Sequence, residues 1–234
     1  MRVVAARFLV RDAGAVAHLW PFFDLVVTTP TLTLRIPTDE QLVQLTDVIR
    51  DGIHAPEWMP FDDPPWTDEP TPERERSWLV RQWAARTTLR PDQWRLRFAV
   101  FDARGEPLGM QDMFATTFPA LRTVGTYSWL GRLHQGRGIG KEMRSAVLHL
   151  AFSCFGAARA ESSAFEDNLG SAGVSRSLGY MENGFEWGLR RGQPERLTRF
   201  VLSEEDWRRT ARGDITTEGV EPCAVVLGLS HNAG

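Results

Sequence analysis

The chain has 234 residues, of which 42% are hydrophobic and 24% charged, and this composition predicts one folded globular domain with short extensions. A formal net charge of −3 provides no overall basic field, so we expect neither a nucleic acid nor a membrane as a partner. The two cysteines have no histidine or cysteine at ligand spacing, which predicts no metal site and fits a reducing, cytoplasmic environment.

The two ends of the chain differ in pattern from its middle. Residues 1–20 are expected to form an N-terminal extension, because Arg7 and Arg11 interrupt the apolar run that a signal peptide requires. No stretch approaches the roughly 18 apolar residues of a transmembrane helix. The predicted domain covers residues 21–212, and residues 213–234 have little periodicity and are expected to form a C-terminal tail.

The first part of the predicted domain contains two strands and a helix. Alternating apolar and polar residues predict strands at 25–27 and 32–36. Thr38 and Gln41 have the spacing of a capping box, so a helix is expected to follow them and to end near Asp51.

A proline-rich segment follows this helix. Residues 54–70 contain five prolines among bulky aromatic side chains, which excludes regular secondary structure. Such a loop either lines a substrate pocket or is simply anchored to the core by its aromatic residues. Thr71 is then expected to cap a second helix that ends near Leu89 and buries Trp78, Leu79 and Trp83.

The remaining elements alternate strands with helices. A hairpin around the turn 102–105 is expected to join strands 97–101 and 108–114. The elements predicted after it are a strand at 123–130, a helix from about 138 to 155, a strand at 159–165, a helix at 169–178, strands at 180–189 and 197–202, and a helix at 204–212. This order predicts an α/β (α+β) fold with a mixed central sheet and helices on both faces.

A glycine-rich turn joins strand 123–130 to the long helix. Gly136, Gly138 and Gly140 remove Cβ atoms at alternate positions, so backbone N–H groups can converge next to the positive end of the helix dipole. This arrangement predicts a phosphate or pyrophosphate site, with an ordinary strand-to-helix turn as the alternative. The turn fits neither a P-loop nor a dinucleotide-binding loop, because both place glycines at other spacings.

The turn does match [Q/R]-x-x-G-x-[G/A], read as Gln135 to Gly140, which is the pyrophosphate-binding motif of GNAT acyl-CoA-dependent N-acyltransferases. Asn168-x-x-Ser171 followed by Leu178-Gly179-Tyr180 resembles the RimJ/RimL-like branch of that family. The segments 28–42 and 200–207 are also similar to that branch. The resemblance extends to an actinobacterial group that includes a mycobacterial protein described as a succinyltransferase.

The resemblance implies a GNAT fold whose sheet is splayed between strands 123–130 and 159–165, where acyl-CoA binds. It assigns the pyrophosphate to the glycine turn and the pantetheine arm to main-chain groups near Leu130, with Asn168 as a further contact. The cofactor-binding residues it implies are Leu130, Gln135, Gly136, Arg137, Gly138, Ile139, Gly140, Lys141, Asn168 and Ser171.

The groups that move protons are left open by the sequence. Many GNAT enzymes have a tyrosine seven residues after this asparagine, and here Ser175 takes that place as the candidate acid for the departing thiol. Asp112 and Glu161 are the leading candidates for the base, because alternate residues of their strands face the cleft. Glu166 and His134 are further candidates, and a chain of water molecules is the alternative to a direct base.

The sequence thus predicts an enzyme that transfers an acetyl or succinyl group from acetyl-CoA or succinyl-CoA to a primary amine of a small molecule or protein, by direct attack in a ternary complex. The alternative is a catalytically weak acyl-CoA-binding sensor or interaction module of the same fold, supported by the absent tyrosine. The resemblance also implies a homodimer.

Overall fold

A computed structural model describes residues 19–229, and within that range the chain forms a nine-stranded mixed sheet in the order β7-β8-β6-β5-β4-β3-β2-β1-β9. The strands are β1 (Val26–Thr28), β2 (Leu32–Arg35), β3 (Gln93–Asp102), β4 (Pro107–Thr116), β5 (Thr123–Leu130), β6 (Arg159–Phe165), β7 (Met181–Arg190), β8 (Gln193–Ser203) and β9 (Thr216–Glu218). The helices are α2 (Asp39–Arg50), α3 (Glu73–Ala85), α4 (Phe118–Leu121), α5 (Ile139–His149), α6 (Leu169–Ser177), α7 (Glu204–Thr210) and α8 (Val220–Val226). The predicted α/β fold and order of elements are confirmed.

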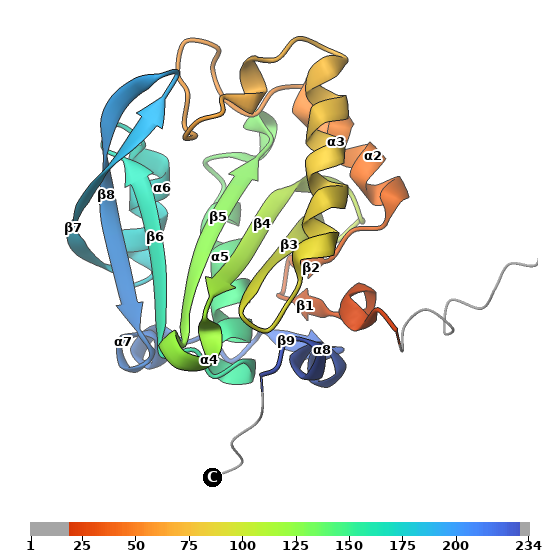
Figure 1. Cartoon of the computed structure of the whole chain (residues 1–234), viewed down its shortest axis with the longest axis vertical. Coiled ribbons are helices and arrows are strands. Elements are labelled where there is room, and N and C mark those ends of the chain that lie inside the picture. The colour runs from red at the N-terminus through yellow and green to blue at the C-terminus, as the bar shows by residue number, and fades with distance from the viewer. Residues whose placement is uncertain (1–18, 230–234) are drawn as a thin grey trace, which may run out of the picture.

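The sheet is covered on both faces, as Figure 1 shows, with α2 and α3 on one side and α5 and α6 on the other. The α2 face buries Leu42, Leu45 and Ile49, which recur at helical spacing, in a cluster with Trp78 and Trp129. The α5 face buries its apolar side chains in a larger cluster that continues beneath the sheet.

The start of α2 follows the predicted capping box. The Thr38 hydroxyl accepts the backbone N–H of Gln41, and the Gln41 side chain accepts the backbone N–H of Thr38. The predicted start of α3 is wrong: the helix begins at Glu73, and the Thr71 hydroxyl donates to the Glu75 carboxylate instead of capping a backbone N–H.

The predicted burial of Trp83 is also wrong. Its side chain is 44% exposed, and its indole N–H donates to Asp39 on α2 at 3.1 Å. The polar edge of the ring therefore reaches an exposed carboxylate, while Trp78, five residues earlier, fills the core.

The sheet is splayed where the sequence predicts. Strands β5 and β6 run parallel, and residues 123–125 pair with residues 159–161. Beyond that point β5 continues to pair with β4, whereas β6 pairs along its whole length with β8, so the two strands diverge toward their carboxyl ends (Figure 1). The opening between them leads directly to the glycine turn.

The C-terminal segment differs from the expected tail. Strand β9 pairs with β1 at the sheet edge, and Cys223 of α8 and the following Leu227 are buried in the main core. A three-residue strand that pairs with the opposite end of the chain leaves little periodicity to detect. The expected extension at 1–20 lies almost wholly outside the described residues. None of the helices in the described range is both long and apolar enough to cross a bilayer.

Candidate active site

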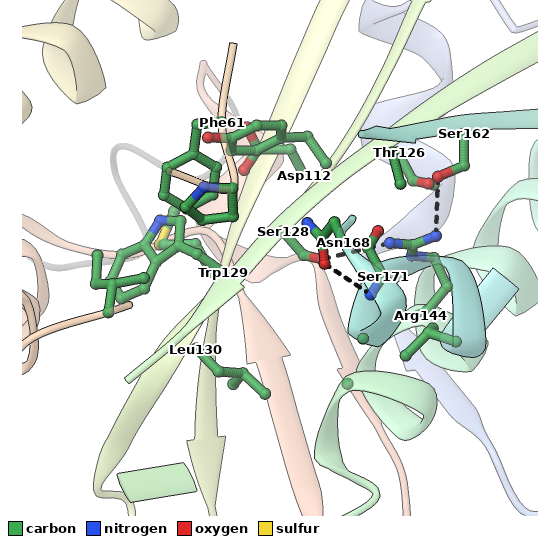
Figure 2. Close-up of a pocket in the computed structure, with 18 of the residues that line it drawn as sticks. Phe61, Asp112, Thr126, Ser128, Trp129, Leu130, Arg144, Ser162, Asn168 and Ser171 are labelled. Carbon is green, nitrogen blue, oxygen red and sulfur yellow. Dashed lines mark hydrogen bonds between the residues drawn. The ribbon is translucent and has the colours of Figure 1, made fainter. Parts of the chain in front are cut away.

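A cavity of about 710 Å³ occupies the splay between β5 and β6. Its walls come from both diverging strands, from the α5 and α6 amino ends, and from the proline-rich loop 54–70 (Figure 2). Trp58, Phe61 and Trp66 of that loop line it, so the pocket-lining interpretation of the loop is confirmed.

The glycine turn forms one end of this cavity. Gly136 and Gly138 have φ angles of +71° and +82°, a conformation that disfavours any residue with a Cβ, and a Cβ at either position would meet no atom within 4 Å. No residue in 19–229 accepts a hydrogen bond from the backbone N–H groups of 136–140, whereas the N–H groups of Lys141 and Glu142 bond to the Gly138 carbonyl. The turn therefore presents free donors beside the amino end of α5.

The Gln135 side chain fixes this turn to the rest of the cavity. Its amide nitrogen donates to the carbonyl oxygens of Ile53 at 2.7 Å and Leu130 at 2.9 Å. Of the ten residues that the resemblance implies for CoA, eight line the cavity, namely Leu130, Gln135, Gly136, Gly138, Gly140, Lys141, Asn168 and Ser171. Arg137 and Ile139 do not: the first is exposed, and the second packs against the core.

Asn168 forms the N-cap of α6 on the opposite side of the opening. Its side-chain oxygen accepts the Ser171 N–H at 3.1 Å, as the dashed line in Figure 2 marks. No described residue accepts a hydrogen bond from the amide nitrogen of the same side chain. Capping thus uses one end of the amide and leaves the other free for a ligand in the cavity.

Asp112 lines the cavity on β4 and is only 4% exposed. Arg95 donates to one of its carboxylate oxygens at 2.7 Å, and Arg97 lies 3.8 Å from the same oxygen. Burial lowers the pKa of Arg97, while the Asp112 charge opposes that effect. Two cations share this carboxylate, which leaves it poorly suited to act as a free base.

The other candidate proton-transfer residues lie away from the cavity wall. Ser175 is completely buried, behind the Arg144 guanidinium. Glu161 pairs with Gly125 at the closed base of the splay and does not line the cavity. Glu166 forms an exposed ion pair with Arg196, and His134 also lies outside the lining. The geometry therefore brings only Asp112 of these candidates to the cavity.

Aromatic side chains form the wall opposite the glycine turn. Phe61 stacks on Trp66 with 5.8 Å between ring centroids, and Trp129 contacts both Trp66 and Trp78. Tyr127 joins this group, and burial raises the pKa of its phenol. This wall is apolar enough to exclude water from a reacting amine.

Ionic and backbone contacts tie the aromatic loop to the β7–β8 hairpin. The Asp63 carboxylate accepts the backbone N–H groups of Arg191 at 2.7 Å and Gly192 at 2.8 Å. Asp68 forms a two-point ion pair with the Arg191 guanidinium. The loop therefore spans the splayed end of the sheet, from the α2–α3 side to the hairpin, as the upper part of Figure 1 shows.

Sequence reasoning missed a polar cluster beneath the opening. Arg144 projects from α5 and is 3% exposed; its guanidinium contacts the Ser162 hydroxyl at 3.2 Å and the Ser128 hydroxyl at 3.4 Å (Figure 2). The signal in the sequence was its position, because Arg144 precedes the apolar Val147 and Leu148 by three and four residues and therefore shares their helix face.

Comparison with known proteins agrees with this geometry. Residues 31–181 match the acetyltransferase (GNAT) domain family. The fold is similar to RimJ from Mycobacterium smegmatis in complex with CoA-disulfide, with 20% identity, a TM-score of 0.67, and coverage of 89% of this chain and 96% of that one. It is also similar to RimL, a ribosomal L7/L12 alpha-N-protein acetyltransferase in complex with coenzyme A, with 16% identity, a TM-score of 0.59, and coverage of 76% and 97%.

A third similar structure is a chimera of the spermidine N-acetyltransferase SpeG from Vibrio cholerae with hSSAT, with 17% identity, a TM-score of 0.58, and coverage of 76% of this chain and 98% of that one. At these identities the structures establish a shared fold, while the family match covers well over half of the chain. The chain therefore belongs to the GNAT acetyltransferase family.

Proposed function

We propose that this protein transfers an acyl group from a CoA thioester to a primary amine by direct attack in a ternary complex. The observation that carries the proposal is the cavity in the β5–β6 splay, which has free backbone donors at one end and an aromatic wall at the other. The first end suits a pyrophosphate, and the second suits an amine that must lose its hydration before it reacts.

Binding of CoA rests mainly on backbone groups. The N–H groups of 136–140 and the α5 dipole hold the pyrophosphate, and the Lys141 ammonium at the cavity edge adds a positive charge. Main-chain groups of Leu130 pair with the pantetheine arm as an added strand would, and the free amide nitrogen of Asn168 donates to an arm carbonyl.

The donor is acetyl-CoA or succinyl-CoA. Arg97 lines the cavity, lies 3.8 Å from the Asp112 carboxylate and has a buried Nε without a hydrogen-bond partner in the described chain, so it favours an anionic group beside it. A succinyl carboxylate or a carboxylate of the acceptor would be such a group. The acceptor is an amine of a small molecule or of a protein.

Proton transfer in this cavity uses water. Asp112 holds Arg95 and Arg97 in place, and Ser175 and Glu161 take no direct part because neither reaches the cavity. The attacking amine gives its proton to a chain of water molecules that leads to solvent.

Turnover assays test the proposal. The purified chain is incubated with acetyl-CoA or succinyl-CoA and a panel of polyamines, amino acids, and peptides with free amino termini, and CoA release is followed with a thiol reagent. Amine-dependent CoA release supports the enzyme. CoA binding without turnover for any donor and amine would favour the binding-module alternative.

We also propose a homodimer. The outward side chains of β7, an edge strand, include Phe185, Trp187 and Leu189, which are all more than half exposed. Light scattering at micromolar concentration gives the mass directly, and a monomer mass would refute this assignment.

A further inference from the structure

The Arg144 guanidinium is a buried cation without a carboxylate partner in the described chain. Its Nη atoms reach the hydroxyls of Ser162, Ser128 and, at 3.5 Å, Ser175, and its Nε has no hydrogen-bond partner among residues 19–229. A buried charge that is not compensated costs several kcal/mol. An arrangement of this kind is expected where a ligand supplies the missing negative charge.

The position of Arg144 indicates which ligand atom that is. Ser128 lies on β5 and Ser162 on β6, so the guanidinium bridges the two strands just beyond the last pairs of their ladder (Figure 2). Ser128, where Arg144 contacts β5, lies about 7 Å from Leu130 at about 3.3 Å per residue. A pantetheine arm that enters at the glycine turn and follows β5 therefore brings its sulfur end over Arg144.

Buried polar groups surround the same point. The Thr126 hydroxyl and the Tyr180 phenol lie beside the guanidinium, and Tyr180 interacts with both Thr126 and Arg144 without a hydrogen bond of good geometry. Because a guanidinium can only donate, each serine that accepts from it keeps its own O–H proton free to donate elsewhere. Ser128, Ser162 and Thr126 all line the cavity, so these protons can point at a ligand.

Resting on the proposed function, we propose that Arg144 is a catalytic residue that stabilises the CoA thiolate as it leaves, with the hydroxyls of Ser128 and Ser162 as donors to the same sulfur. The amine nitrogen forms a bond to the thioester carbonyl carbon, and the C–S bond breaks with its electron pair going to sulfur. The ammonium proton passes to water, which yields an amide, CoA thiolate and one released proton. Arg144 donates no proton, because a guanidinium remains charged in proteins.

This role explains how the site works without an acid at position 175. A nearby cation favours the charged form of a thiol and so lowers the pKa of the leaving group. The Tyr180 phenol lies beside Arg144, and the charged or titratable groups on the cavity wall are Asp62, Asp63, Arg81, Arg95, Arg97, Asp112, the Tyr127 phenol and Lys141. Burial raises the pKa of both phenols, so they stay neutral up to about pH 10.

The test compares CoA with desulfo-CoA, in which hydrogen replaces the thiol, by calorimetric titration from pH 6.5 to 9.5. A bound thiol whose pKa is about one unit below that of the free CoA thiol tightens CoA binding relative to desulfo-CoA, and this gain grows toward about tenfold as the pH rises through the pKa of the free thiol. Arg144→Met is expected to abolish this pH-dependent gain, whereas Arg144→Lys retains part of it. Ser162→Ala, which keeps the Arg144 charge, is expected to reduce the pH-dependent gain in CoA affinity.

If the ratio of CoA affinity to desulfo-CoA affinity in the wild-type protein does not change with pH, the inference is overturned, whether or not any variant folds. The same pH-dependent gain in folded Arg144→Met would overturn it as well. Failure of the proposed function is seen separately, as the absence of amine-dependent CoA release in the turnover assay.

Discussion

Gly109 on β4 is the position where the structure makes the sharpest stability prediction. It pairs with Leu130, the last residue of β5, and the two backbones approach too closely for a side chain. A Cβ at this position would lie 2.2 Å from the Trp129 carbonyl oxygen and 2.8 Å from the Leu130 Cα. Gly109→Ala must therefore push β4 and β5 apart next to the glycine turn.

The displacement is large for a packed sheet. Real Cβ contacts do not fall below 3.0 Å, so the strands must separate by about 0.8 Å. That movement weakens the bond from the Gly131 N–H to the Leu108 carbonyl, now 2.9 Å. Overpacking costs about 1–3 kcal/mol and each lost backbone bond about 1 kcal/mol, so we expect a loss of about 3 kcal/mol in the free energy of unfolding.

Urea denaturation measures this loss, and Gly105→Ala in the β3–β4 turn is the matched control. Gly105 also has a positive φ, of +83°, but its Cβ would meet no atom within 4 Å, so the control should lose only about 1 kcal/mol. CoA affinity should fall in Gly109→Ala alone, because Leu130 anchors the Gln135 side chain. If Gly109→Ala is as stable as the control, the close approach of the strands is wrong.

Three further predictions concern the turn, the α6 cap and a buried thiol. Gly138→Ala forces a Cβ onto a φ of +82° and should weaken CoA binding about tenfold in calorimetry. The Cβ of Gly140→Ala would make an ordinary 3.5 Å contact with Val174, so this variant should keep the full stability of the protein. Asn168→Ala removes the bond to the α6 backbone and should lower the free energy of unfolding by about 1 kcal/mol, and recovery in Asn168→Asp would identify capping as the cause. Burial raises the pKa of Cys223 from 9.0 to about 12. The neutral thiol therefore makes its full contribution to stability below about pH 9. That contribution is lost as the pH rises toward 12, by at most about 1.4 kcal/mol per pH unit. The loss of unfolding free energy between pH 8 and pH 10 should be smaller in Cys223→Ala than in the wild-type protein. Equal losses in the two proteins would refute the assignment of this effect to the Cys223 thiol.

Local sequence signals predicted the fold well where they depend on near neighbours. The Thr38 capping box and the glycine turn each involve residues within a few positions of one another, and both form. The splay between β5 and β6 was predicted from the family resemblance and not from a local sequence signal. Strand β9 escaped prediction because its partner β1 lies at the other end of the domain, and a three-residue strand has almost no pattern.

The site was harder to predict, because side-chain partners come from separate elements. Asp112 had the character of a free base in the sequence, but the β3–β4 register places Arg97 directly opposite it and Arg95 beside it. Ser175 occupies the expected position in α6, yet the helix turns its side chain toward the core. Arg144 is a single charged residue on an apolar helix face. Its role could not be predicted from the sequence, because its polar partners lie on β5 and β6.

Calorimetric titration of acetyl-CoA into the wild-type protein, Gly138→Trp and Gly213→Trp tests the central claim most directly. Gly213 lies in an open segment outside the cavity, where a Cβ meets no atom within 4 Å, so its variant controls for the added indole. The account predicts binding of micromolar strength, about −8 kcal/mol, in the wild type and in Gly213→Trp, and its loss in Gly138→Trp. Binding that survives in Gly138→Trp, or no binding to the wild-type protein, would contradict the assignment of the glycine turn and the splayed cavity to acyl-CoA.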